Sequence, residues 1–502
     1  MLTTKHPQYI EMAPLWQALR DFHAGSDTVK KAGVKYLPPT EGMVLDGMGA
    51  NQPGFRAYEA YKMRARVPDY ITEGVRALLG LLHQKPPTIK LPAGMEYLRH
   101  KATAQGESLV AMMRRVNFEQ LVLGRVGILG DIMPGETNPH VAVYTGESIT
   151  NWNVREGELT ASKLQLVVLD ETGPKFNMAN LGWETVPQYR VAWLGDSGVY
   201  HQKVFTGANL TFSPEDPITP SWRGTTLRYI PFEFINGNDT LSDIDTPPLQ
   251  SLLDICIGIY LGEADFRQNL YMQTQQTLVV KGGVQNPNGE VGKDEDAIRT
   301  GAGARIDVSM EGDAKYIGTD PGGLQMQSKA IADDRRRAEL KAGELVQQSR
   351  SQAESGKAMA TRYNAQTATL NALATAGGEG IQGLLRKLAE WMGEDPEEVI
   401  VIPNTEFIDF SLDGRSFADI MSAIRENGLP LSLESVHAIL ADRGLTSLDF
   451  KTEMEKIGSE LQEWAPVIEM MQRLTAKQQQ DELKAAAKPA TNVGGADTGD
   501  DA

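Results

Sequence analysis

Cysteine is almost absent from this chain of 502 residues, and the one that occurs is Cys256. A single cysteine cannot form an intramolecular disulfide, and it cannot build a cysteine-rich metal site. The composition therefore fits a protein made in a reducing compartment such as the cytoplasm. Because Cys256 lies on the apolar side of a helical pattern, we expect it to pack in a core.

Long apolar runs are absent as well. The most apolar stretch, residues 252–261, is too short and too charged to span a bilayer. Residues 1–7 lack the apolar run of a signal peptide. We therefore expect a soluble protein with no membrane partner. Since 41% of the residues are apolar, the chain can still bury ordinary cores, and its length predicts roughly three domains.

Basic residues are outnumbered, because 49 lysines and arginines stand against 66 aspartates and glutamates, which gives a net charge of −17. A sequence-specific DNA-binding protein needs a basic surface to neutralise phosphates, so this class is disfavoured. A channel through which DNA slides needs only weak binding, and an acidic wall with a few basic rings would provide it. Alternatively, the charge only keeps a soluble protein in solution.

The common catalytic motifs are missing from the sequence. A P-loop needs a glycine five residues before its Gly-Lys pair and a Ser or Thr after it, and the pairs at Gly292 and Gly356 fail both conditions. No Gly-x-Ser-x-Gly motif occurs, and the seven histidines form no His-x-x-x-His pair. Asp243 and Asp245 could bind a divalent ion, but we interpret them as caps of a turn before Pro247. We expect no enzyme activity, no cofactor and no metal.

The most informative stretch is residues 247–373, which begins with an amphipathic helix. This helix opens at Pro247, and its apolar residues fall at helical spacings: Leu252, Leu253, Cys256, Ile259, Tyr260 and Leu270. From residue 282 to 323 the helical pattern is replaced by ten glycines and short alternating pieces at 305–308 and 315–317. This pattern predicts a small β-rich insert.

A second, unusually polar helix is predicted for residues 324–346. Its apolar stripe repeats every seven positions, at Leu324, Ile331, Ala338 and Leu345, and charged residues fill most of the other positions. A helix that is polar nearly all round either bridges domains through solvent or faces a water-filled space in an assembly. We expect that neighbouring subunits, rather than this chain alone, bury the narrow stripe.

A third helix is predicted to begin at Gly356 and to carry its apolar stripe as far as Trp391. The cluster Gly377, Gly378 and Gly380 interrupts the stripe. A glycine inside a helix costs about 1 kcal/mol relative to alanine, so the cluster predicts a kink or a break.

The remaining segments divide into helical and alternating patterns. Residues 1–110 are mainly helical, including 9–23, and 121–236 alternate with period two, which predicts an antiparallel sheet. The strand candidates are 122–131, 140–144, 164–170, 189–194, 199–205 and 227–234, and 399–402 and 407–410 could add strands to the same sheet. Helices are predicted at 417–426, 433–442 and 450–474, and residues 486–502 are expected to be disordered.

The order of these elements resembles the portal protein, or head-to-tail connector, of tailed bacteriophages. Local matches support the resemblance: the start of the first helix at Pro247-Pro248-Leu249, its end at Leu278-Val279-Val280-Lys281-Gly282, and Glu354-Ser355-Gly356-Lys357-Ala358-Met359, which is similar to the family's Ser-Gly-x-Ala-Leu element. Methionine stands at Met359 where leucine is usual in the family. Ser148-Ile149-Thr150-Asn151-Trp152 resembles a strand of the portal wing.

The resemblance implies an α+β, portal-like architecture with a helical and β wing, two stem helices, a β-rich clip insert, a long kinked helix and a helical crown. The wing would comprise residues 1–245 and 359–425, and the stem 246–280 and 324–348. The clip would be 281–323, the tunnel loop 349–358 and the crown 426–485.

The resemblance also implies the residues that face DNA. Candidates for a basic belt in the channel are Lys329, Arg335, Arg336, Lys341 and Arg350, and candidates for the tunnel loop are Gln347, Gln348, Ser349, Ser351, Ser355 and Gly356. The alternative for the basic run is a solvated helix face in which Arg337 pairs with Asp333, and Arg335 with Glu339, at i,i+4 spacing.

By resemblance, the protein would form a dodecameric ring at one vertex of a virion, assembled in the host cytoplasm, through which double-stranded DNA passes. Its partners would be the terminase large subunit, head-completion or adaptor proteins, and the major capsid or scaffolding protein. Two alternatives remain open. One is another virion structural protein, such as a minor capsid or adaptor subunit, and the other is a metal-dependent nucleic-acid enzyme that uses Asp243, Asp245 or Glu311.

Overall fold

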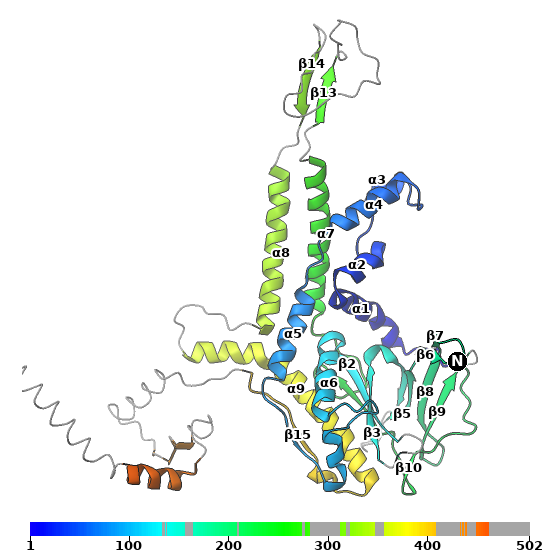
Figure 1. Cartoon of the computed structure of the whole chain (residues 1–502), viewed down its shortest axis with the longest axis vertical. Helices are drawn as coiled ribbons and strands as arrows, with labels where there is room; N and C mark the ends of the chain where they lie inside the picture. Colours follow the sequence, from blue (N-terminus) through cyan, green and yellow to red (C-terminus); the bar gives the residue numbers. More distant parts are fainter. Residues whose placement is uncertain are drawn as a thin grey trace, which may run out of the picture. The chain divides into compact units, whose positions relative to one another are not determined.

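The computed structural model describes most of the chain. The described residues are 1–132, 136, 138–155, 164–207, 210–273, 277–281, 312–317, 322–346, 356–407, 432, 434–435, 437–438 and 448–460. The chain divides into two compact units, Met1–Phe407 and Ile408–Ala502. The first unit combines helices with antiparallel sheets, so the α+β class is confirmed at this coarse level (Figure 1).

Helices fill most of the first 123 residues, as the sequence predicts. They are α1 (Pro7–Ala24), α2 (Ser26–Ala32), α3 (Glu41–Leu45), α4 (Pro53–Arg64), α5 (Tyr70–Leu82) and α6 (Leu109–Leu123), with 3-10 turns at Gly33–Lys35 and Ala93–Arg99. Helix α1 starts at a proline, and the side chain of His6 caps it by accepting a hydrogen bond from the Gln8 amide at 3.3 Å. Helix α6 ends at Gly124, which has the left-handed φ of 71°.

The strands of the first unit form two main antiparallel sheets rather than the single predicted sheet. Their orders are β12-β2-β3 and β4-β5-β8-β9. The strands are β2 (Arg125–Asp131), β3 (His140–Thr145), β4 (Ile149–Val154), β5 (Leu164–Asp170), β8 (Gln188–Leu194), β9 (Tyr200–Thr206) and β12 (Phe232–Asn236). A 3-10 turn at Gly146–Ser148 separates β3 from β4 and carries the chain from one sheet to the other.

Short strands complete this region. β6 (Gly173–Asn177) and β7 (Gly182–Val186) form a hairpin that the sequence analysis did not predict, and β10 (Ser221–Trp222) pairs with β11 (Thr225–Thr226). Strand β15 (Ile400–Ile402) pairs with β1 (Thr88–Lys90) in a separate two-stranded sheet. The expectation that residues 399–402 extend the main sheet is therefore wrong, because their partner lies in the segment that links α5 to α6.

A large hydrophobic core connects the helical layer with both sheets. Its fully buried side chains include Trp16, Phe22, Tyr200 and Trp391. Cys256 is also buried there, as predicted, and burial raises the pKa of its thiol to about 12. A smaller cluster of Leu2, Val168, Val191, Trp193 and Phe205 covers the other face of the four-stranded sheet, as the alternation of side chains along a strand requires.

The two predicted central helices are confirmed. Helices α7 (Gln250–Gln273) and α8 (Gly322–Val346) lie side by side (Figure 1). Between them in the sequence, β13 (Thr277–Lys281) and β14 (Asp313–Ile317) form an antiparallel pair. The strand predicted at 315–317 is part of β14, whereas the one predicted at 305–308 lies outside the described residues.

Helix α9 (Gly356–Met392) is continuous through the glycine cluster, so a break does not occur there, and a kink at these glycines stays a prediction. The glycines are required by close packing. A Cβ on Gly377 would lie 2.7 Å from Asn117 Nδ2, and a Cβ on Gly380 would lie 2.4 Å from Ile235 Cγ1. Tertiary contacts therefore explain the cluster, and they offset the low helix propensity of glycine.

The second unit is described only in part. Residues 450–460 are helical, in agreement with the first part of the helix predicted at 450–474. Four predictions lie outside the described residues: the helix at 417–426, most of the helix at 433–442, the strand at 407–410 apart from Phe407, and the tail at 486–502.

Candidate functional site

The middle of the apolar stripe of α8 is buried within this chain. Ile331 is 7% exposed, and it packs against α7 at Gly262, where an added Cβ would lie 3.4 Å from its Cγ1. Ala338 is fully buried and belongs to the large core, and α5 also packs on α8. The expectation that neighbouring subunits bury this stripe is therefore wrong for Ile331 and Ala338, because α7 and α5 of the same chain cover them, and it stays a prediction for the rest of the stripe.

An ion cluster joins α7 to α8 next to this stripe. The side chain of Glu263 on α7 is only 4% exposed, and its carboxylate accepts hydrogen bonds from Arg267 Nε at 2.6 Å and from Arg335 Nη2 at 2.5 Å. A buried carboxylate needs such partners, since an unpaired buried charge is strongly destabilising. Arg335 therefore holds the helix pair together, and the i,i+4 partner expected for it, Glu339, accepts from the Tyr70 hydroxyl at 3.4 Å.

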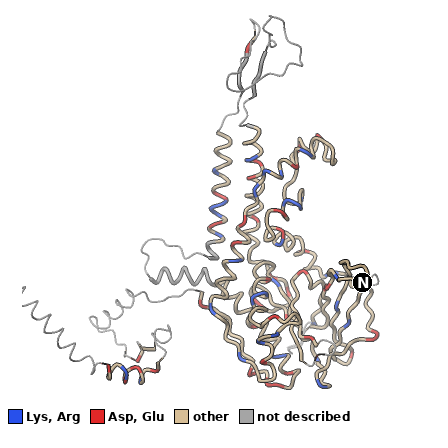
Figure 2. The backbone as a smooth tube through the Cα atoms, in the orientation of Figure 1, with Lys and Arg blue, Asp and Glu red and all other residues tan. Residues whose placement is uncertain are grey.

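The outward face of α8 carries the remaining basic candidates. Lys329 and Arg336 are exposed, and within the described part of the chain neither has an ion pair or hydrogen bond. They are seven residues apart, so they lie on one side of the helix about 10 Å from each other along its axis. Arg337 pairs with Asp334 at 3.4 Å rather than with the expected Asp333. Figure 2 shows basic and acidic residues interspersed along α8.

The structure describes only some of the remaining residues that the sequence analysis proposed for the channel and the tunnel loop. Lys341 is exposed on α8, and Gly356 is the first residue of α9. Arg350 and the tunnel-loop candidates Gln347, Gln348, Ser349, Ser351 and Ser355 lie outside the described residues. Glu311, one candidate for an alternative metal site, also lies outside them.

Asp243 and Asp245 act as loop-capping residues, as the sequence analysis proposes. The Asp245 carboxylate accepts from the backbone N–H and side chain of Asn238 at 3.0 and 3.2 Å. The Asp243 carboxylate accepts from Gln8 Nε2 at 2.9 Å. Among the described residues, no group of three or more His, Cys, Asp or Glu side chains is arranged to hold a metal ion.

The same loop wraps around Arg125, which is fully buried. Its Nη1 donates to the carbonyls of Ser242 and Asp243 at 3.0 and 3.1 Å, and its guanidinium lies 4.5 Å from the Trp152 ring. Burial lowers the pKa of Arg125 to about 9, although the nearby aspartates of the loop oppose this effect. Arg125 thus fixes the segment that leads from β12 into α7.

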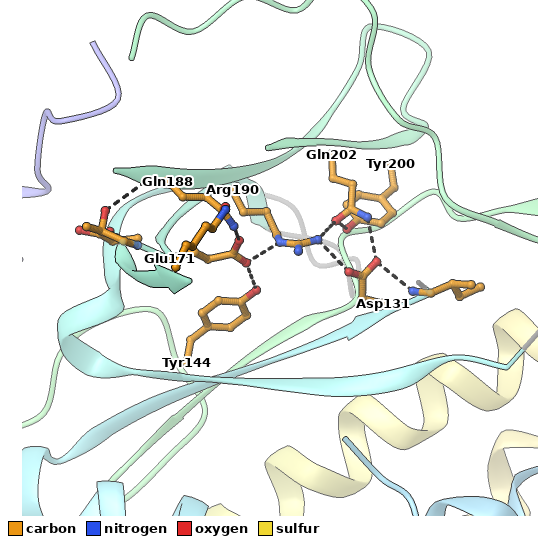
Figure 3. A network of polar contacts seen from close by, with 11 residues as sticks. Asp131, Tyr144, Glu171, Gln188, Arg190, Tyr200 and Gln202 are labelled. Atoms are coloured by element: carbon orange, nitrogen blue, oxygen red, sulfur yellow. Dashed lines mark hydrogen bonds and ion pairs between the residues drawn. The ribbon is translucent and has the colours of Figure 1, made fainter. Parts of the chain in front are cut away.

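A polar network between the two sheets lines a cavity of about 400 Å³ (Figure 3). Arg190 donates from Nε to Glu171 and from Nη1 to Asp131, both at 2.7 Å. Gln202 donates to Asp131 at 2.8 Å, and the Tyr144 hydroxyl donates to Glu171 at 2.7 Å. These residues come from β2, β3, β8, β9 and the end of β5, so the network ties one sheet to the other.

The chemistry of this network is structural, because each carboxylate oxygen already has a donor. The second oxygen of Glu171 accepts from Gln188 at 2.6 Å, and Asp131 Oδ1 also accepts from the Ile132 amide at 2.9 Å. Burial alone would raise the pKa of Glu171, but Arg190 and the other donors hold it below its ordinary value. Neither carboxylate is available as a general base. The sequence analysis missed this network, and a charged Arg190 inside an apolar strand pattern was its only local signal.

Among the helices that the structure describes, none is both long and apolar enough to cross a bilayer.

Comparisons with known proteins give one family and several distant structures. A family model described as "Domain of unknown function (DUF4055)" matches residues 248–392, the segment that contains α7 and α8. No curated protein matches the chain.

Three solved structures are similar to the chain at low identity. For "Neck of empty GTA particle computed with C6 symmetry" the TM-score is 0.39, with 13% identity over 74% of this chain and 90% of that chain. For "Virion of native gene transfer agent (GTA) particle" the TM-score is 0.38, with 14% identity over 80% of this chain and 98% of that chain. For "Neck of native GTA particle computed with C12 symmetry" the TM-score is 0.37, with 12% identity over 74% of this chain and 89% of that chain. Values this low establish neither a common fold nor a common function.

Proposed function

We propose that this chain is a virion structural protein and, more specifically, the portal subunit of a phage-like particle. It forms a ring of twelve copies at one capsid vertex, catalyses no reaction, and provides the channel through which double-stranded DNA is packaged and ejected. The order of elements and the motifs around Pro247 and Gly356 support this proposal by their resemblance to portal proteins.

The observation that carries the proposal is the geometry of the helix pair. Helices α7 and α8 contain 24 and 25 residues, which corresponds to about 36 Å of helix each. Ile331 and Ala338 of the apolar stripe are buried inside the chain, and α8 presents Lys329 and Arg336 outward. In a ring, each of these side chains is repeated in every subunit and becomes a basic belt in an otherwise acidic wall.

The proposal assigns roles to the segments named from the sequence. Residues 1–245 and 359–425 form the wing, α7 and α8 the stem, 281–323 the clip, and 426–485 the crown. The clip docks the terminase large subunit during packaging and head-completion proteins afterwards, while residues 349–358 lie near the DNA. Arg335 is better assigned to the stem's internal ion cluster than to the channel wall, because it pairs with Glu263.

The test is electron microscopy of the purified protein, with native mass spectrometry on the same sample. We expect rings of about twelve subunits around an open channel, the stoichiometry implied by the resemblance. Discrete oligomers without a channel would favour a minor capsid or adaptor protein. A compact dimer that turns over nucleic acid with divalent ions, and loses this activity in Asp245→Asn, would refute the proposal.

A further inference from the structure

Residues 1–6 run from the segment after β9 to strand β4, and we call them the N-terminal strap. Figure 1 shows the N-terminus beside β8 and β9. The side chain of Leu2 is 4% exposed and belongs to the small apolar cluster on this sheet. The Leu2 amide donates to the Leu210 carbonyl at 2.8 Å, and Asn151 Nδ2 donates to the Thr4 carbonyl at 3.1 Å. One apolar side chain and a few hydrogen bonds therefore hold the strap in place.

His6 joins the strap to β4 and to α1. Its amide donates to the Thr150 carbonyl at 2.9 Å, and its imidazole stacks on Trp152, with ring centroids 3.9 Å apart and planes 20° apart. Its Nδ1 accepts the hydrogen bond from the Gln8 amide that caps α1. A ring nitrogen that accepts a hydrogen bond carries no proton, so this arrangement requires the neutral imidazole with its proton on Nε2.

The positive charges around His6 also favour the neutral ring. The guanidinium of Arg125 lies 4.5 Å from the centroid of the Trp152 ring on which His6 stacks, so a protonated His6 would bring a second cation to that ring. The N-terminus of α1, which starts at the next residue, is the positive end of the helix dipole. Lys5 is the preceding residue, and its ammonium lies 4.6 Å from the centroid of the Tyr9 ring.

One nearby acidic side chain acts in the opposite direction. Asp243, in the loop before α7, favours the charged imidazole, but its carboxylate already accepts from Gln8 Nε2 at 2.9 Å. Strand β4 contributes no titratable side chain. Burial and the charge of Arg125 outweigh Asp243, so the pKa of His6 lies below its ordinary value. The docked strap therefore binds a proton less readily than a released strap does.

We propose that His6 is a pH-sensitive anchor, which keeps the strap docked while its ring is neutral and releases it when the ring takes up a proton. Protonation removes the acceptor that caps α1 and brings two cations to one indole ring. Release uncovers the apolar cluster under Leu2. The inference goes beyond the proposed ring and does not depend on it, since every group that it uses belongs to one chain.

The expected pH dependence follows from the two states of the strap. In the released strap His6 has its ordinary pKa of about 6.5. Above this pH both states are neutral at His6, and docking is at its strongest. Below it, each pH unit favours release by up to about tenfold, until the pKa of the docked state is reached.

Electron paramagnetic resonance of a spin label on the strap tests the inference. Thr3→Cys places the label on an exposed residue of the strap, and Cys256 does not compete for it because it is buried. A docked strap gives a slow component and a released strap a fast one, so their ratio measures docking. From about pH 7.5 to about pH 5.5 we expect the ratio of docked to released strap to fall by up to about tenfold.

Two variants of His6, each with the same label, show which group titrates. His6→Asn keeps a good N-cap for α1 but takes up no proton, so its ratio should not change with pH. His6→Phe keeps an aromatic ring against Trp152 and repeats the test if asparagine holds the strap too weakly. The matched control is His23→Asn near the other end of α1. Burial lowers the pKa of His23 as well, and this variant should respond to acid as the parent chain does.

Two results would overturn the inference. If the mobility of the label on the parent chain stays the same across this pH range, His6 only caps α1 and the strap is not released by acid. If the response to acid persists in both His6 variants, another group titrates. Ring formation is measured separately, so neither result bears on the portal proposal.

Discussion

Replacing Glu263 by glutamine should loosen α8 from α7. The substitution keeps the size of the side chain but removes the charge that two arginines share. Removing one partner of a buried ion pair costs about 3–5 kcal/mol when the remaining charge stays buried. Here Arg335 is 45% exposed and can regain water. We therefore expect a smaller loss of about 1–3 kcal/mol in the local stability of the helix pair.

Hydrogen exchange followed by mass spectrometry measures this loss where it occurs. Amides of α7 and α8 that exchange by local opening should lose protection by about 5- to 150-fold, since each 1.4 kcal/mol is a factor of ten. Peptides from β5 and β8 should not change. The matched control is Asp334→Asn, which breaks an exposed pair with Arg337 on the same helix and should cost about 0.5 kcal/mol or less.

The reasoning would be refuted if Glu263→Gln changed the protection of α8 no more than Asp334→Asn does. A double-mutant cycle with Arg335→Gln provides a second criterion. If Glu263 and Arg335 contribute through one contact, their combined effect should be smaller than the sum of the single effects by about 0.5 kcal/mol or more. Strict additivity would mean that the 2.5 Å contact between them does not stabilise the pair.

Three further predictions follow from the structure. Replacing Lys329 and Arg336 by alanine should leave ring formation unchanged but reduce DNA packaging, and unchanged packaging would rule out the basic belt. Gly380→Ala should destabilise the protein because its Cβ would lie 2.4 Å from a β12 side chain, whereas Gly258→Ala, with nothing within 4 Å, should stabilise α7 by up to about 1 kcal/mol in denaturant unfolding. The pKa of Glu171 is lowered in the folded protein, so its contribution to stability should be present above its unfolded pKa and disappear as the pH falls through the folded value. Glu171→Gln should flatten that part of the acid unfolding profile, and an identical profile would contradict the assignment.

The sequence predicted the helix pair well because its signal is local. The spacing of Ile331 and Ala338 is a property of α8 alone, and the structure buries both residues. What buries them was not predictable from that spacing, since α7 lies more than fifty residues away in the sequence. The same holds for Arg335, which could reach Glu339 on its own helix but pairs with Glu263. Contacts between distant segments depend on the fold, which periodicity does not specify.

Two errors have a different origin. The cluster around Gly377 and Gly380 was interpreted through helix propensity, but the close approach of Asn117 and Ile235 determines these positions. The β6–β7 hairpin was missed because neither of its faces is buried, and an exposed hairpin shows no alternation between core and solvent. Of the candidate site, the basic face of α8 was visible in the sequence, whereas the ion cluster and the sheet-to-sheet network were not.

The pairing of β1 with β15 has a consequence for how the protein is made. Thr88 is the register partner of Ile402, so this small sheet joins segments more than 300 residues apart. At a synthesis rate of roughly 5–20 residues per second, the second strand leaves the ribosome about 15–60 s after the first. Helix α9, which covers β12, is also completed only shortly before that strand. We expect nascent chains stalled before residue 356 to remain sensitive to protease, and only finished chains to be competent for assembly.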